Sequence, residues 1–510
     1  MQFEEKIEEK KPRMWVAVMP IFFLVVALSL NVYYLGSDAL GGASQILLII
    51  SALLCFGIAK FETGVTWAKT EQTIVKHIGD STPAILILFM IGALSGTWML
   101  SGVVPTMIYY GLQLIDPSTF LLTACVISAI VSVAAGSSWA TVATIGVAMM
   151  GVGKALGYAD GWIAGAIISG AYFGDKVSPL SETTNLAANI TGTPLFKHIR
   201  YMMITTVPNF IITLIVFFVA GLMIDTQGEA QMTGFTEALK SSYMISSWLL
   251  LIPVGTFVLI SKKMPTLIIL MISSVVAAVV AAIFQTPINE MITGITNDKL
   301  AAGVMSSFQA MYGSVTVDTG YPALNELVAT KGMGGMMNTV WLILAAMTFG
   351  GCMEAGGMLR SISDAMIKLM RNTFSTVGCT TFSCLFLNVT TADQYISILL
   401  PGKMFAGIYK DKGYDTALLS RTLEDSATVT GVLIPWNACG LTQATVLNVS
   451  TMTYLPYCFF NILSPITTLI IAAVGYKIKK RDFVSEDFVE SVEMAGGMES
   501  VNCLNAKVEA

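Results

Sequence analysis

Long apolar runs divide this chain into segments of about 20 residues, the length that an α-helix needs to cross a bilayer. The clearest runs are residues 14–35, 42–60, 83–112, 201–224, 265–284, 338–359 and 454–476. Lysine and arginine gather in alternate connections, which orients the helices because cytoplasmic loops carry the excess of positive charge. The pattern predicts a protein that crosses the membrane many times.

One polar stretch interrupts this pattern in the middle of an apolar run. Residues 174–185 read Gly-Asp-Lys-Val-Ser-Pro-Leu-Ser-Glu-Thr-Thr-Asn, and Pro179 prevents a continuous helix because it lacks a backbone donor. Non-helical backbone at membrane depth is tolerated only where protein or water covers it, and a carboxylate there indicates function. We therefore expect residues 175–185 to form half of an ion or solute site.

Two further segments are too short to hold two spans each, and each has polar residues at its middle. Residues 119–153 carry Gly-Ser-Ser-Trp-Ala-Thr at 136–141, and residues 374–409 carry Asn-Val-Thr-Thr-Ala-Asp-Gln at 388–394. We expect both segments to be re-entrant hairpins with polar tips. A second polar-interrupted span, residues 416–447, follows the second hairpin.

The order span, hairpin, broken helix, span occurs twice, and the two copies match at a shift of about 255 residues. With one short gap, Asp175 pairs with Asp425 and Asn185 with Asn437. The charge pattern makes the first hairpin open from outside and the second from inside. We predict an all-α polytopic membrane protein with inverted repeats, each with a re-entrant hairpin and a discontinuous helix, which is an architecture of secondary transporters.

The expected segments follow from these boundaries. They are a cytoplasmic N-terminus at residues 1–13, N-terminal helices at 14–78, a first inverted repeat at 79–224, connecting helices at 225–337, a second inverted repeat at 338–476 and a cytoplasmic tail at 477–510. Within the N-terminal part, residues 61–78 are amphipathic and are expected to lie along the membrane interface.

Composition supports the membrane assignment and excludes several functions. The 510 residues are 55% hydrophobic and 12% charged, whereas soluble domains are about one-quarter charged. Two histidines and eight cysteines without a C-x-x-C pair give no metal-site pattern. Because Walker A and G-x-S-x-G motifs are absent, we expect neither a pump nor an enzyme, no cofactor and no nucleic-acid partner.

Carboxylates inside the apolar segments are the scarce chemical groups. Asp175 and Asp393 are the first candidates for a Na⁺ site, because each lies at an interruption in one half and hard oxygen ligands suit this ion. A carboxylate in a low-dielectric site holds its proton more tightly than one in water, so H⁺ and Na⁺ can compete for the same oxygens. The alternative role for both residues is to cap a half-helix or, for Asp175, to pair with Lys176.

The other charged candidates each have a structural alternative. Glu424 and Asp425 follow Arg421 by three and four residues, so one of them can pair with it, and which one stays open. Glu354 either lines the pathway or reaches the inner interface. Lys176 is either the counter-charge of Asp175 or a snorkelling side chain. Glu182 is a further acidic candidate in the first interruption.

Oxygen-bearing side chains at the tips and breaks complete the expected ion-binding set, with helix packing as their alternative role. They are Ser137, Ser138, Ser178, Thr184, Asn185, Thr390, Thr391 and Asn437.

The longest of these motifs, Ala-Tyr-Phe-Gly-Asp-Lys-Val-Ser-Pro-Leu-Ser-Glu-Thr-Thr-Asn-Leu-Ala-Ala at residues 171–188, closely resembles the NhaC-type Na⁺/H⁺ antiporter family. Gly-Ser-Ser-Trp-Ala-Thr at 136–141, Glu-Asp-Ser-Ala-Thr-Val-Thr at 424–430 and Ile-Pro-Trp-Asn at 434–437 resemble it too, and the likeness covers residues 15–475. The resemblance implies a bacterial plasma-membrane protein with paired hairpins. Glu182 stands where the family usually has Asp.

We therefore expect a secondary active antiporter that exports Na⁺ in exchange for H⁺, with the lipid bilayer as its surroundings and a homodimer as a further expectation. The alternative is an organic-acid exchanger of the malate/lactate type, which needs a positive group such as Arg421 or Lys176 facing its substrate. An ion channel or receptor is the rival from another class.

Overall fold

The structure, a computed structural model, describes residues 11–35, 41–224, 229–262 and 264–478. Within these ranges the regular secondary structure is helical apart from one isolated β-bridge between Val315 and Thr330, which confirms the all-α prediction. Seven of the described helices are long and apolar enough to cross a membrane, or up to nine if each of two bent pairs counts as one span. The chain is a multi-pass membrane protein. The expectations for residues 1–10 and 479–510 lie outside the described residues.

The first part of the chain runs from α1 to α10. Its helices are α1 Met14–Leu35, α2 Ala43–Thr63, α3 Trp67–Leu100, α4 Val103–Leu114, α5 Phe120–Ala135, α6 Ser138–Thr141, a π-helix Val142–Gly146, α7 Val147–Ala155, α8 Asp160–Val177, α9 Glu182–Thr191 and α10 Leu195–Met223.

A connecting part and a second half follow. The connecting helices are α11 Glu229–Ser242, α12 Leu251–Ser261, α13 Thr266–Phe284, α14 Thr286–Thr293, α15 Lys299–Tyr312 and α16 Pro322–Val328. The second half consists of α17 Met337–Ala355, α18 Met358–Leu369, α19 Thr373–Thr390, α20 Gln394–Asp411, α21 Thr416–Leu423, a π-helix Glu424–Thr428, α22 Ala438–Leu447, α23 Thr451–Tyr454 and α24 Phe459–Val474.

One expected boundary lies inside a helix, because α3 is a single helix where the sequence indicated two segments. Thr66 caps its first turn by accepting a hydrogen bond from Lys69, and the helix continues through Pro83 to Leu100. The chain breaks after Ser101 instead, where Gly102 adopts a φ of 82° that favours glycine. Residues 67–78 therefore belong to the same helix as the span that was expected to begin at residue 83, and the expected boundary after residue 78 lies inside α3.

The helices are interrupted at each polar patch that the sequence singled out. The α5–α6 break lies at Gly136, with a φ of 65°, and the α19–α20 break at Ala392, with a φ of 55°. The α8–α9 break spans residues 178–181, and residues 429–437 separate the second π-helix from α22 apart from a short 3-10 turn. A Cβ on Gly136 would lie 2.6 Å from the Cβ of Leu180, so the α5–α6 break and the α8–α9 break touch each other.

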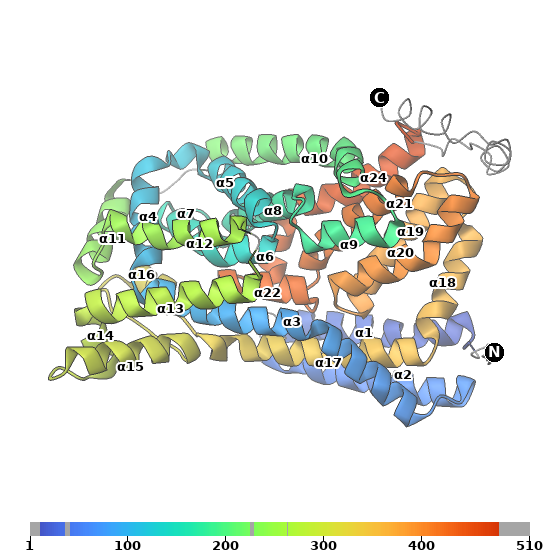
Figure 1. Cartoon of the computed structure of the whole chain (residues 1–510), viewed down its shortest axis with the longest axis horizontal. Helices are drawn as coiled ribbons and strands as arrows, with labels where there is room; N and C mark the ends of the chain where they lie inside the picture. The colour runs from blue at the N-terminus through green and yellow to red at the C-terminus, as the bar shows by residue number, and fades with distance from the viewer. Residues whose placement is uncertain (1–10, 36–40, 225–228, 263, 479–510) are drawn as a thin grey trace, which may run out of the picture.

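The broken helices lie beside one another at the centre of the bundle. In Figure 1, α5 and α7 lie to the left, whereas α19 and α20 lie to the right, on the side of the two termini. The α5 helix packs along α8, and α20 packs against α9. A Cβ on Gly170 would lie 2.0 Å from the carbonyl oxygen of Cys125, so the backbones of α8 and α5 are in direct contact there.

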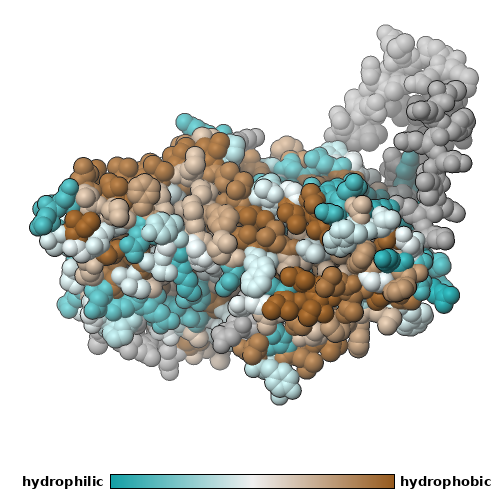
Figure 2. Space-filling model, turned by 90° about the horizontal axis from the view of Figure 1, so that it is seen from below, coloured by the Kyte–Doolittle hydropathy of each residue, from teal (hydrophilic) through white to brown (hydrophobic). Residues whose placement is uncertain are grey.

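The outer surface carries large hydrophobic side chains, as a bilayer requires. Phe22, Leu53 and Ile283 are exposed examples from three different helices. Figure 2 shows broad hydrophobic areas on the face seen from below. The polar breaks therefore lie inside a bundle whose outside is apolar.

Candidate ion site

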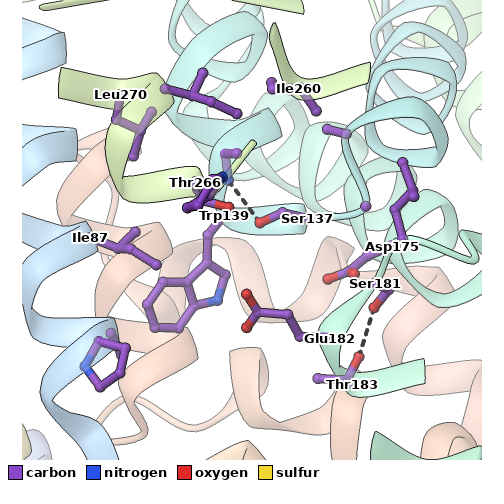
Figure 3. A pocket seen from close by; sticks show the side chains of 18 of the residues that line it. Ile87, Ser137, Trp139, Asp175, Ser181, Glu182, Thr183, Ile260, Thr266 and Leu270 are labelled. Atoms are coloured by element: carbon purple, nitrogen blue, oxygen red, sulfur yellow. Dashed lines mark hydrogen bonds between the residues drawn. The ribbon is translucent and has the colours of Figure 1, made fainter. Parts of the chain in front are cut away.

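A cavity of about 550 Å³ lies where the breaks of the two halves meet. Its walls come from the middle of α3, the α5–α6 and α8–α9 breaks, the junction of α12 and α13, and the start of α20. Four carboxylates line it, from Asp80, Asp175, Glu182 and Asp393. No lysine, arginine or histidine is among the described residues that line it. Figure 3 shows the Asp175 and Glu182 side chains reaching into this space near the Ser137 hydroxyl.

Asp175 connects the α8–α9 break to the tip of the first hairpin segment. Its Oδ2 atom accepts hydrogen bonds from the backbone N of Ser138 at 3.0 Å and from the Ser138 hydroxyl at 2.7 Å. The neighbouring Ser137 caps α6 and lines the cavity. Asp175 is 7% exposed. Its carboxylate therefore accepts a hydrogen bond from a backbone N–H at the start of α6 that has no partner within the helix, and it also faces the cavity.

Asp393 lies in the second half, at the α19–α20 break. It caps α20, because its Oδ1 atom accepts a hydrogen bond from the backbone N of Ile396 at 2.9 Å. It also lines the cavity and is 6% exposed. Two residues later, the Tyr395 hydroxyl donates to Glu182 Oε2 at 2.7 Å, which ties this tip to the α8–α9 break. The capping role that was an alternative for Asp393 thus coexists with its place in the cavity wall.

Lys176 contacts Asp425 rather than Asp175. Its ammonium group donates to Asp425 Oδ1 and, at 3.0 Å, to the Ser464 hydroxyl, and both charged side chains are fully buried. Thr205 and Thr468 also donate to the Asp425 carboxylate. A buried ion pair needs such additional hydrogen bonds to offset its desolvation. The expectation that Lys176 is the counter-charge of Asp175 is therefore corrected.

Arg421 forms its ion pair with Asp425, not with Glu424. Its Nε atom is 3.9 Å from Asp425 Oδ2, and its guanidinium carbon is 4.7 Å from the centre of the Tyr201 ring. Glu424 is fully buried, and neither carboxylate oxygen has a hydrogen-bond partner among the described residues. Of the two acids, Asp425 is thus the one that pairs with Arg421. None of these three side chains lines the cavity.

Most of the predicted hydroxyl and amide side chains donate hydrogen bonds to backbone carbonyls at or near the interruptions. Asn185 donates to the carbonyls of Pro179 and Ser181, and Asn437 donates to the carbonyl of Asn388. Side-chain to backbone bonds of the same kind are made by Ser178 to Val133, Thr184 to Lys176, Thr390 to Phe386 and Thr391 to Leu387. Of the predicted oxygen-bearing set, Ser137 lines the cavity directly and Ser138 holds one of its carboxylates.

Glu354 lies away from the cavity, next to the end of α17. Its Oε2 atom is 2.6 Å from His77 Nε2, and its side chain is 42% exposed whereas His77 is 3% exposed. Lys76 and Lys403 are the charged groups near this pair. Glu354 was expected either to line the pathway or to reach the inner interface. It does not line the cavity and lies toward the end of the bundle instead.

Sequence reasoning missed several residues of the site. Asp80 lines the cavity, but it lies between the segment that the pattern placed at the interface, residues 61–78, and the span that was expected to begin at residue 83. The hydroxyls of Thr205, Ser464 and Thr468 bind Asp425 from α10 and α24, and isolated hydroxyls in apolar helices carry no sequence signal of such a contact. Tyr395 was findable in principle, because it follows Asp393 by two residues at the expected tip.

Comparisons with known proteins place this architecture in a family. The model of the Na⁺/H⁺ antiporter family matches residues 170–476. The Na⁺/H⁺ antiporter NhaC of Alkalihalophilus pseudofirmus is 36% identical over 82% of this chain and 87% of its own length. The arginine/ornithine antiporter ArcD of Halobacterium salinarum is 34% identical over 94% and 96%, and the malate-2H⁺/Na⁺-lactate antiporter of Bacillus subtilis is 32% identical over 89% and 92%. The chain belongs to the Na⁺/H⁺ antiporter family.

Proposed function

We propose that this protein exports Na⁺ in exchange for H⁺ across a bacterial plasma membrane and holds the transported ion between Asp175 and Asp393. The observation that carries the proposal is the charge of the cavity, which four carboxylates and no described basic side chain line. Four carboxylates around one cavity repel one another when they are ionised, and a cation bound among them relieves this repulsion. A small cation is therefore the substrate that this cavity fits.

Exchange follows from competition for the same oxygens. When Asp175 and Asp393 are ionised, their free carboxylate oxygens and the Ser137 hydroxyl offer hard ligands to Na⁺. When either carboxylate binds H⁺, it loses its charge and its affinity for the metal ion. Na⁺ and H⁺ are thus transported species in this proposal, and neither is a resident cofactor.

The proposal includes an inverted-repeat architecture. The two interrupted hairpin segments extend toward opposite ends of the bundle in Figure 1, and each contributes one capping contact at its tip, through Ser138 and Asp393. In transporters of this kind one repeat rocks against the other around a central site. We infer that both hairpins are re-entrant and that the end of the bundle with the two termini faces the cytoplasm.

Purified protein in liposomes that contain a pH-sensitive dye tests the activity. We expect Na⁺ added outside to drive H⁺ movement and dye dequenching, with saturation as the Na⁺ concentration rises. Absence of a Na⁺ response at every pH from about 6 to 9 would refute the proposal. Transport against a Na⁺ gradient, driven by a pH gradient alone, separates an antiporter from a channel.

Exchange of a dicarboxylate, as in the malate/lactate relative, fits the cavity poorly. Lys176 is bound to Asp425, and neither it nor Arg421 lines the cavity, so no described positive group faces a carboxylate substrate. The same charge favours an organic cation as a second substrate class, and one relative is named an arginine/ornithine antiporter. Competition of arginine, but not malate, with Na⁺-driven H⁺ movement would support this second candidate; competition of malate alone would reverse the argument.

A further inference from the structure

The pair of His77 and Glu354 lies between the end of the bundle and the tip of the second hairpin segment. His77 is one helical turn before Asp80 and Ser81, which line the cavity, but the imidazole itself does not line it. Its Nε2 atom is 2.6 Å from Glu354 Oε2. A buried imidazole is thus bound on one side to a carboxylate that is 42% exposed.

The other ring nitrogen of His77 has no hydrogen-bond partner among the described residues. This Nδ1 atom is buried, and the histidine is 3% exposed. It faces the region of Gly350, where an added Cβ would lie 3.5 Å from His77 Nδ1 and 3.6 Å from Thr391 Cα. Thr391 is two residues from Asp393, so the free side of the ring is directed toward the start of α20.

Charges around the ring come from three helices. Lys76 and Asp80 belong to α3, Glu354 to α17, and Asp393 and Lys403 to α20. His77 and Asp80 are close enough to Asp393 to interact with its charge. Glu354 is the only one of these groups to which the His77 ring is hydrogen bonded in the described structure.

We propose that Glu354 and His77 form a proton relay between the end of the bundle and Asp393, separate from the cavity through which Na⁺ reaches the same carboxylate. The relay rests on the proposed Na⁺/H⁺ exchange. Glu354 takes a proton from water and gives it to His77 Nε2, while the proton on Nδ1 passes toward Asp393. Each transfer breaks one bond to hydrogen and forms one, and the ring is left neutral with its proton on Nε2. A combined rotation about the Cα–Cβ and Cβ–Cγ bonds then turns Nδ1 toward Glu354 and the Nε2–H toward Asp393, so that the next proton enters at Nδ1 and leaves from Nε2.

Separate routes have a physical advantage for exchange. Protons cross a hydrogen-bonded relay that is too narrow for a metal ion, whereas Na⁺ needs several oxygen ligands and therefore the open cavity. The missing side chain of Gly350 leaves space beside Nδ1, which a water molecule between the ring and the Asp393 tip requires.

The experiment compares His77→Gln and Glu354→Gln with the wild type in full-length protein. Na⁺-driven H⁺ flux is measured in dye-loaded liposomes across pH, and Na⁺ affinity is measured by calorimetry at alkaline pH. We expect each variant to lose about 100-fold in H⁺ flux, the contribution typical of a positioned acid–base group. Na⁺ affinity should stay within about twofold, because the relay residues are not Na⁺ ligands.

Two further variants keep the test decisive. Gly350→Ala places a methyl group at ordinary contact distance from both Nδ1 and Thr391, so it fills the gap without a clash and should slow H⁺ flux while the protein folds normally. Lys410→Gln is the control, because it removes an exposed charge of α20 that is not among the charges near Glu354, and it should leave the flux unchanged.

The outcomes separate the relay from the function on which it rests. A wild type without Na⁺-coupled H⁺ flux overturns both. An active wild type whose His77→Gln and Glu354→Gln variants keep normal flux, or lose flux and Na⁺ affinity together, overturns the relay alone and assigns the pair a structural role.

Discussion

Lys176 from the first broken helix and Asp425 from the second form a fully buried ion pair. The ammonium group lies next to Asp175 in the sequence, yet it points away from the cavity to the other half of the protein. This contact leaves Asp175 without a bound cation from the protein itself. It also joins the two halves at the level of their interruptions.

Removing one member of this pair should destabilise the protein strongly. We expect Lys176→Met or Asp425→Leu alone to cost about 3–5 kcal/mol, because each leaves an uncompensated buried charge. The double variant should recover part of that loss, since it removes both charges of this pair but leaves the buried Arg421 without Asp425. Thermal unfolding in detergent gives the double-mutant cycle, and additive losses in the double variant would show that the two residues do not interact.

Ser138 should set the pH at which Na⁺ is exchanged. Its backbone N and hydroxyl both donate to Asp175 Oδ2, and a hydrogen bond to a charged group contributes about 1.5–3 kcal/mol. Without the hydroxyl, the Asp175 carboxylate keeps its proton up to a higher pH. Ser138→Ala should therefore move half-maximal Na⁺-driven flux about one to two pH units upward.

The pH–rate profile of the reconstituted protein checks this prediction against a matched serine. Ser178 lies in the α8–α9 break, three residues after Asp175, but its hydroxyl donates to the carbonyl of Val133. Ser178→Ala should leave the midpoint in place. Equal midpoints in the two variants would exclude a special role for Ser138.

Gly170 should be irreplaceable where α8 crosses α5. A Cβ there would lie 2.0 Å from the Cys125 carbonyl oxygen, so Gly170→Ala must push the two helices apart at a cost of about 1–3 kcal/mol or more. Gly407 in α20 has no atom within 4 Å of the corresponding position, and Gly407→Ala should be neutral or stabilising. Unfolding temperatures in the same detergent compare the two variants, and an equal response would contradict the close packing.

The interruptions of the fold were predictable because their residues violate the rules for a continuous apolar helix. Pro179, the polar stretch around it and the glycine at position 136 mark breaks that the structure contains. Pro83 gave the opposite result, since α3 continues through it and ends at Ser101. One proline in an apolar helix is thus a weaker signal than a proline within a polar stretch.

The partners of the charged residues were not predictable from spacing. Asp425 lies four residues from Arg421, but Lys176, which is far away in the sequence, makes the closer contact. His77 and Glu354 likewise come from helices of different halves. Helical spacing gives only local neighbours, whereas contacts between halves depend on how the broken helices pack.

The central claim is that Na⁺ and H⁺ compete for the carboxylates between the two interruptions, and calorimetric Na⁺ binding at a series of pH values tests it most directly. We expect the apparent Kd for Na⁺ to rise about tenfold for each unit by which pH falls through the competing range. Asp175→Asn and Asp393→Asn should each abolish or greatly weaken binding. A Na⁺ affinity that is independent of pH, or that survives both substitutions, would contradict the account.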